Sequence, residues 1–259
     1  MLVLIDPYLS DALAQKYAGT ALPHLRMMEP PIRAEQLPRV EAVLITHRHG
    51  DHLDRVALPQ IAKLWPDCRF VVPAAEAAIL VELGIPRARI DAADVGGEIA
   101  LASATVHPVP AAHETLEYDA AGHCRYLGYV LALRQATLYH SGDCIPFPGL
   151  ASALAPFAID VALLPVNGRD ARRSMSGIPG NFTLDEAVAL CVDQAIPTMI
   201  AHHFGMFDFN TIPVERIEAK ARAVTASLQL LPAAFHTRYV LVGGEGSEAR
   251  PSIFMREVS

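Results

Sequence analysis

The feature that most constrains this chain is the segment "LITHRHGDHLD" at residues 44–54, which places three histidines and an aspartate within six positions after an apolar run. Residues two apart on an extended segment point the same way, so His47 and His49 can hold one cation together. Asp51 and His52 come at the turn into the next helical pattern and can face a second cation. Imidazole and carboxylate suit Zn²⁺, Mn²⁺ or Fe²⁺. A polar loop whose histidines bond only to backbone is the alternative, and this spacing disfavours it.

Further candidate ligands also follow apolar, strand-like runs. His113 ends such a run in "VPAAHE", and Asp143 leaves another in "LYHSGD", where a carboxylate could bridge two cations or simply cap the turn. In "AHHFGMF", His202 and His203 face opposite sides of a strand, so only one of them can be the last ligand. Polar residues at the exits of neighbouring strands converge at one edge of a sheet, where α/β proteins place their sites.

Strand-like and helical patterns alternate along the chain, and no linker, charge run or repeat divides it. The segment "FTLDEAVALCVDQA" predicts a helix, because Thr183 and Glu186 have the spacing of a capping box. The longest helix is expected over 214–231, and a β-hairpin over 125–143. Strands in both hairpins and strand–helix units predict one α/β domain over residues 1–259.

Composition limits the partners that the chain can bind. The net charge of −7 argues against broad contact with a nucleic-acid backbone, which needs clustered Lys and Arg. No apolar run reaches the roughly 18 residues of a membrane span. The start lacks the features of a signal peptide, and the four scattered cysteines form no CxxC pair. We therefore expect a cytoplasmic protein that binds neither nucleic acid nor membrane.

The motifs "THRHGDHLD", "AAHE", "SGD" and "HHFG", in this order, resemble those of the metallo-β-lactamase superfamily. The segments "LIDPYLSD", "LLPVNGR", "NFTLDEAV" and "HHFGMF" are most similar to the branch that includes L-ascorbate-6-phosphate lactonase. This resemblance implies an αββα sandwich that holds two divalent metal ions, zinc or manganese, with iron as a further option. It implies His47, His49 and His113 as ligands of the first ion, Asp51, His52 and His203 as ligands of the second, and Asp143 as the bridge.

The start of the sequence departs from that family pattern. Members usually begin with two strands carrying a pattern like "GHASFLI", whereas this sequence starts at "MLVLIDPYLSD". We therefore expect a sandwich that lacks the first N-terminal hairpin. Such a fold leaves an edge strand uncovered unless residues 237–242 or another chain pair with it, so a homo-oligomer is among the expectations.

The expected activity is metal-dependent hydrolysis. A hydroxide that bridges two cations is a nucleophile at neutral pH, and it would attack a lactone, ester or phosphoester of a small anionic, phosphorylated metabolite. Asp51 and Asp143 would be the catalytic carboxylates, with Asp51 orienting the nucleophile and passing a proton to the leaving group. Two alternatives are a nuclease or phosphodiesterase of the same superfamily, and a non-catalytic metal-binding oligomeric scaffold.

Substrate-binding residues are expected in "NGR". Asn167 and Arg169 follow a buried strand, and the arginine fork could hold a phosphate or carboxylate. A surface arginine paired with a nearby acid explains Arg169 equally well. Asp6, Tyr8 and Asp54 are expected beside the site as supports rather than as ligands.

Overall fold

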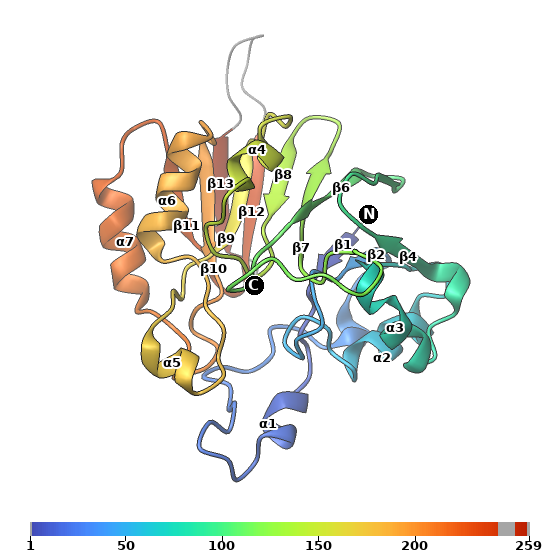
Figure 1. Ribbon diagram of the computed structural model, residues 1–259. Helices are drawn as coiled ribbons and strands as arrows, with labels where there is room; N and C mark the ends of the chain where they lie inside the picture. The colour runs from blue at the N-terminus through green and yellow to red at the C-terminus, as the bar shows by residue number, and fades with distance from the viewer. Residues whose placement is uncertain (1, 243–251, 258–259) are drawn as a thin grey trace.

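The computed structural model describes residues 2–242 and 252–257. Two β-sheets face each other, with helices on their outer sides (Figure 1). In chain order the strands are β1 (Leu2–Ile5), β2 (Val40–Leu44), β3 (Arg69–Pro73), β4 (Ile90–Ala93), β5 (Ile99–Ala100), β6 (Thr105–Pro110), β7 (Leu127–Ala132), β8 (Thr137–His140), β9 (Val161–Pro165), β10 (Thr198–His202), β11 (Gln229–Pro232), β12 (Thr237–Val242) and β13 (Ser252–Glu257). The α-helices are α1 (Ala12–Lys16), α2 (Ala57–Leu64), α3 (Ala77–Glu82), α4 (Leu150–Leu154), α5 (Ala171–Met175), α6 (Leu184–Asp193) and α7 (Val214–Ala223).

The first sheet has four parallel strands in the order β1-β2-β3-β4. Its strands are short apolar runs, as expected where both faces of a parallel sheet are covered. On its outer face, Val43 and Phe70 pack with Leu58 and Ile61 of α2 and with Leu80 of α3. This packing fixes α2 directly after the histidine-rich segment.

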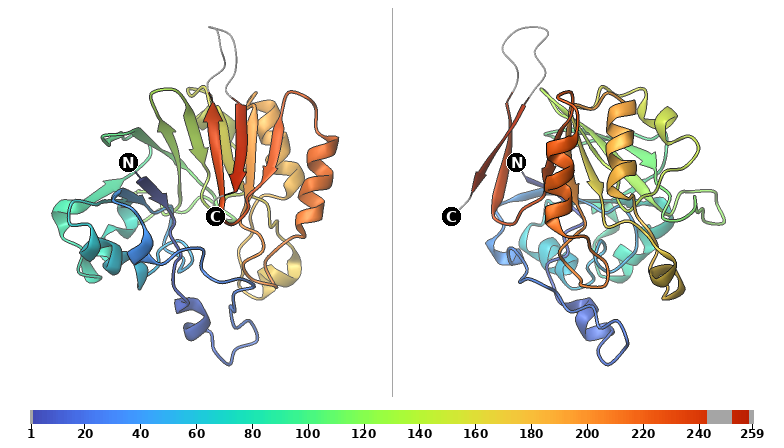
Figure 2. Two further views of the ribbon diagram at one scale, coloured as in Figure 1. Left: turned by 180° about the vertical axis from the view of Figure 1, so that it is seen from behind. Right: turned by 90° about the vertical axis from the view of Figure 1, so that its left-hand side faces the viewer.

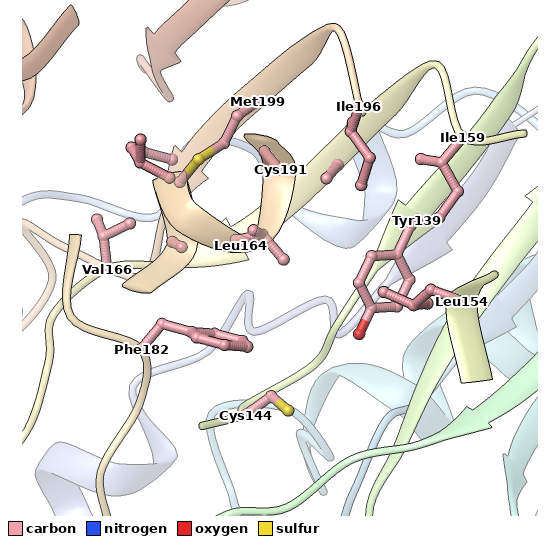
Figure 3. Close-up of a cluster of buried hydrophobic side chains, with 14 of the residues drawn as sticks. Tyr139, Cys144, Leu154, Ile159, Leu164, Val166, Phe182, Cys191, Ile196 and Met199 are labelled. Atoms are coloured by element: carbon pink, nitrogen blue, oxygen red, sulfur yellow. The ribbon is translucent and has the colours of Figure 1, made fainter. Parts of the chain in front are cut away.

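The second sheet has seven strands in the order β11-β10-β9-β8-β7-β6-β5. Strands β5 to β8 pair antiparallel, and β8 to β11 pair parallel. Figure 3 shows the outer core of this sheet, where Tyr139 and Leu164 of the strands lie near Leu154 of α4 and Cys191 of α6. The hairpin predicted over 125–143 is thereby confirmed as β7 and β8.

The two sheets meet through a buried apolar layer. Leu44 and Val71 of the first sheet pack with Val106 and Leu127 of the second. Tyr129 crosses the layer, and its hydroxyl donates a hydrogen bond to the carbonyl of Ile45 at 2.7 Å. The layer holds the exits of strands from both sheets at one edge of the sandwich.

The C-terminal strands form a hairpin of their own. Residues 237–242 pair antiparallel with residues 252–257, and Tyr239 and Leu241 pack against Ile200 of the seven-stranded sheet. Figure 2 shows this hairpin, in red, against the face of the sheet opposite α6 and α7. Within the described residues, β1 pairs only with β2, so the edge strand expected to be uncovered is present.

The longest predicted helix is wrong in its second half. Helix α7 ends at Ala223, and residues 229–232 form β11 beside β10. Val224 adopts an extended backbone, and Leu228 donates to the carbonyl of Thr225 in a turn. The β-branched pair 224–225 disfavours helix, and the following apolar run buries itself as a strand. No helix within the described residues is long and apolar enough to cross a membrane.

Candidate metal centre

All seven side chains assigned to the metal centre from the sequence lie together at the edge where strands of both sheets end. Their donor atoms form three overlapping groups, each with its atoms within 4.8 Å of one another. The groups are His47, His49 and His113; His47, His52 and Asp143; and Asp51, His52 and His203. The structure thus brings together every proposed ligand, from segments that lie up to 156 positions apart (residues 47 and 203).

The histidine-rich motif is a short extended exit followed by a helical turn. His47 Nε2 lies 3.0 Å from His49 Nδ1, so the two nitrogens converge. The backbone N–H groups of His52 and Leu53 both donate to the carbonyl of His49. This turn carries Asp51 and His52 to the other side of the centre, as the sequence predicts.

Asp143 lies between the two sides of the centre. Its Oδ2 is 3.4 Å from His113 Nε2, while its Oδ1 is 3.2 Å from His203 Nε2 and 3.4 Å from His52 Nε2. One carboxylate oxygen therefore faces each side. This is the arrangement that a bridging carboxylate requires.

Hydrogen bonds to Nδ1, on the side of the ring away from Asp143, orient the rings of two histidines. Asp6 lies 2.7 Å from His52 Nδ1 and also accepts from the N–H and hydroxyl of Thr46. The carbonyl of Gly180 lies 2.9 Å from His113 Nδ1. Because these Nδ1 atoms have partners outside the centre, the Nε2 atoms of His52 and His113 are left to face Asp143.

Asp54 anchors the loop that carries Asp6. Its buried carboxylate accepts hydrogen bonds from the N–H groups of Leu9 and Ser10 and from those of Val56 and Ala57 at the start of α2. The segment after β1 is thereby tied to the helix that follows the histidine-rich motif. Asp6 and Asp54 thus support the site, as the sequence predicts.

Burial keeps the first group of histidines neutral. It lowers the pKa of His47 well below the ordinary value, lowers that of His49 to about 4, and lowers that of His113 as well. A neutral imidazole has a free lone pair, which is the form that binds a cation.

The second side of the centre holds charge. Burial is the largest single effect and lowers the pKa of His52 and His203. The neighbouring carboxylates of Asp143 and Asp51, joined by Asp6 at His52, together outweigh it, so the pKa of both histidines is raised. Burial in turn raises the pKa of Asp143, yet the neighbouring His203 and His52 hold it well below the usual range. A metal ion bound here would take the place of these histidine protons.

Buried polar atoms without a hydrogen-bond partner indicate whether the residues of the centre fit a cation. His52 Nε2, His203 Nε2 and Asp143 Oδ1 are buried and have no hydrogen-bond partner, although Asp143 Oδ1 lies 3.4 Å from His52 Nε2 and 3.2 Å from His203 Nε2. Buried polar atoms are nearly always partnered, so three orphans in one cluster call for a further ligand. Nitrogen and carboxylate donors at one point fit a divalent transition-metal ion.

Strained backbone surrounds the centre. Asp6, Glu114 and His203 have φ values of 48°, 82° and 59°, a region that non-glycine residues rarely adopt. Gly142 has a φ of 61°, and a Cβ there would lie 2.8 Å from the Cβ of Thr46. Only glycine lets the loop carrying the Asp143 carboxylate approach the end of β2 this closely.

The two adjacent histidines have different places. His203 joins Asp51 and His52, whereas His202 stacks on His140 with ring centroids 4.7 Å apart. Only one of the two histidines, His203, thus belongs to a candidate metal group; it follows β10 with a positive φ rather than continuing the strand.

Asn167 and Arg169 both have partners inside the protein. Asn167 is buried and donates to Asn210, and the guanidinium of Arg169 binds both carboxylate oxygens of Glu186 at 2.7 and 2.6 Å. Neither residue lines the cavities beside the centre. Arg169 therefore fits the alternative of an arginine paired with a nearby acid, and substrate binding by both residues stays a prediction.

Two cavities meet at the centre, and both are lined by Asp51 and His203. One, of about 390 Å³, has a mainly apolar lining that includes His202 and Phe204. The other, of about 340 Å³, is more polar and also reaches Asp143. A small molecule can therefore reach the proposed ligands from either side.

Sequence comparison places the chain in a family. Residues 2–204 match the family model described as the Beta-lactamase superfamily domain. The chain belongs to the metallo-β-lactamase superfamily. A "UPF0173 metal-dependent hydrolase" of Pyrobaculum calidifontis is 32% identical over 231 residues, which cover 86% of this chain and 85% of the relative, so the chain also belongs to the UPF0173 family.

Another relative is longer than the region it shares. A "UPF0173 metal-dependent hydrolase" of Myxococcus xanthus is 29% identical over 213 residues, which cover 79% of this chain but 64% of the relative. The chain thus spans less than two thirds of that protein. Neither of these two relatives is described as a lactonase, so the narrower resemblance to the lactonase branch stays a prediction.

Solved structures of two hydrolases share the fold. A possible metal-dependent hydrolase from Veillonella parvula has a TM-score of 0.68 at 17% identity, with 90% of each chain covered. An isothiocyanate hydrolase from Delia radicum gut bacteria has a TM-score of 0.67 at 20% identity, covering 90% of this chain and 89% of that one. The predicted metallo-β-lactamase-like α/β fold, with two sheets and flanking helices, is confirmed.

Proposed function

We propose that this protein is a metal-dependent hydrolase that cleaves a lactone, ester or phosphoester of a small anionic, phosphorylated metabolite. The observation that carries the proposal is the position of Asp143, one oxygen of which faces each side of a cluster of histidines. Membership of a family described as metal-dependent hydrolases supports it.

The proposed centre holds two divalent ions, zinc or manganese, with iron as a further option. His47, His49 and His113 would hold the first ion, Asp51, His52 and His203 the second, and Asp143 both. When bound, such a pair of ions would lower the pKa of water toward about 7 and polarise an electrophilic substrate.

Asp51 is placed to move the proton. Its Oδ2 lies 3.8 Å from both His52 Nε2 and His203 Nε2, and its side chain lines both cavities. It can accept a proton from the attacking water and deliver one to the leaving group on either side. No serine or cysteine nucleophile is needed, and Cys144, the thiol next to Asp143, is buried with its pKa raised by burial to about 12.

The test is reconstitution with metal followed by a substrate screen. Chelator-treated protein would be loaded with zinc, manganese or iron and assayed on phosphorylated lactones, simple esters and bis(4-nitrophenyl) phosphate, with the metal-free protein as control. Metal-dependent turnover of a lactone or ester supports the proposal. Turnover confined to phosphodiesters and nucleic acid would favour the nuclease alternative, and metal uptake without any turnover would favour the scaffold. Failure to take up metal would contradict the proposal.

A further inference from the structure

The polar cavity of about 340 Å³ carries positive side chains that the proposed reaction does not use. Arg48 and Lys16 line it together with His49, His113 and Asp143. We propose that Arg48 and Lys16 bind an anionic carboxylate or phosphate group of the substrate and so select which ester is cleaved. This inference rests on the proposed hydrolase function and adds its specificity residues.

Both side chains are available. Arg48 and Lys16 are exposed, and neither makes a hydrogen bond or ion pair with any of residues 2–242 and 252–257. The Lys16 ammonium lies 4.9 Å from the ring centroid of Tyr17. No other lysine or arginine of the described chain lines this cavity.

Neighbouring arginines are already occupied. Arg26 donates to the carbonyls of Tyr8 and Ser10, and Arg173 pairs with Asp170. Arg169, expected from the sequence to bind substrate, is held by a carboxylate, as described above. Arg48 differs because it has no such partner among the described residues and lines the cavity, in the sequence between the proposed ligands His47 and His49.

Charge favours an anion at this place. The chain carries a net charge of −7, yet Arg48 and Lys16 line this cavity without an ion pair, and the proposed metal ions would offset the charge of Asp51 and Asp143, which also line it. A local positive site in an acidic protein attracts an anionic substrate and orients it, since the rest of the surface repels it. Arginine can hold a carboxylate or phosphate through two parallel hydrogen bonds.

Aromatic rings form another wall of the same cavity. The rings of Tyr17 and His24 are stacked with centroids 4.1 Å apart, and those of Phe207 and Phe209 lie parallel at 5.7 Å. His24 contacts both phenylalanines edge-on. Such a surface suits a planar or apolar group. The substrate class is therefore a small molecule with an oxyanion at one end, a flat or apolar body, and the scissile bond at the metal centre.

A matched pair of esters tests this inference. The ester 4-acetoxybenzoate carries a free carboxylate, and its methyl ester has the same acetyl group and ring without the charge. We expect wild-type protein to prefer the anion in kcat/KM, and we expect Arg48→Gln and Lys16→Gln each to reduce that preference by about tenfold, mainly through KM. Lys63→Gln, on the exposed side of α2 and outside the cavity, makes the same charge change and should keep the wild-type ratio.

Binding of the product separates this inference from the proposed function. Titration calorimetry with 4-hydroxybenzoate and its methyl ester, on metal-free protein, reports anion binding without turnover. Weaker binding of the carboxylate by Arg48→Gln supports the inference even if no ester is hydrolysed. Absence of hydrolysis would count against the proposed function alone. An unchanged ester preference in the double variant with wild-type metal content, or no binding preference for the carboxylate in wild-type protein, would overturn the inference.

Discussion

Both sides of the proposed metal centre depend on a single carboxylate, that of Asp143. It is buried among three histidines, and each of its oxygens faces a different side of the centre. We expect Asp143→Ala to lower kcat/KM by at least about 100-fold, because removing even an indirect support of a metal ligand costs 10- to 100-fold. Steady-state kinetics would measure the loss, with circular dichroism to show a retained fold. Wild-type turnover in this variant would remove the bridging role.

Substitution of Asp6 tests whether residues outside the ligand set orient the ligands. It holds His52 Nδ1 and receives two hydrogen bonds from Thr46, so Asp6→Ala leaves the imidazole free to rotate. We expect metal affinity to fall by about 10- to 100-fold, measured by competition with a coloured chelator. The exposed Asp67, which pairs only with Arg39 on the surface, provides the control Asp67→Ala, for which wild-type affinity is expected. Equal affinities in the two variants would contradict the role of Asp6.

Residue-level prediction succeeded where a side chain follows an apolar run. Strand exits gather at one edge, so His113, Asp143 and one of His202 and His203 could be expected to lie together there; His203 was singled out by the family resemblance. The Gly180 carbonyl behind His113 carried no signal, since a backbone group has no residue type. The sequence could not decide whether Arg169 binds substrate or pairs with an acid. Its partner Glu186 lies 17 positions later, in α6, and approaches Arg169 only in the folded chain.

Helix α6 is the element whose start bears most directly on the site. Asn181, just before it, accepts a hydrogen bond from the N–H of Cys144, next to Asp143. The predicted capping box is confirmed: Thr183 accepts from the N–H of Glu186, and the Glu186 side chain accepts from the N–H of Thr183. We expect Thr183→Ala to lower the free energy of unfolding by about 1 kcal/mol, measured by urea denaturation. Thr183→Ser keeps the hydroxyl and should stay near the wild-type value; equal losses would argue against the cap.

Other elements depended on contacts that sequence does not show. The helical pattern over 214–231 gave way to a strand because β10 offers an unpaired edge to residues 229–232. Residues 237–242 read as a late strand, and their pairing with residues 252–257 rather than with β1 was decided by the apolar face of the second sheet, on which Leu241 packs. The strand at 237–242 was thus predictable from its composition, while its partner and the strand at 229–232 were not.

The proposed metal ligands follow strands of both sheets, so a bound ion would link the two sheets of the molecule. A cation that binds only the folded state stabilises it by about 4 kcal/mol at a thousandfold excess over Kd. We expect removal of metal by chelation to lower Tm by about 8–16 °C, taking about 2–4 °C per kcal/mol for a chain of this size. Scanning calorimetry would show the shift, and re-added zinc or manganese should reverse it. A Tm that does not change when chelator is added would show that metal binding at the centre is not coupled to folding.

Anomalous diffraction from crystals of the zinc-reconstituted protein tests the proposed two-metal centre most directly. We expect two peaks about 3.5–4 Å apart, one among His47, His49 and His113, the other among Asp51, His52 and His203, with Asp143 contacting both. A single peak, or peaks on other residues, would contradict it.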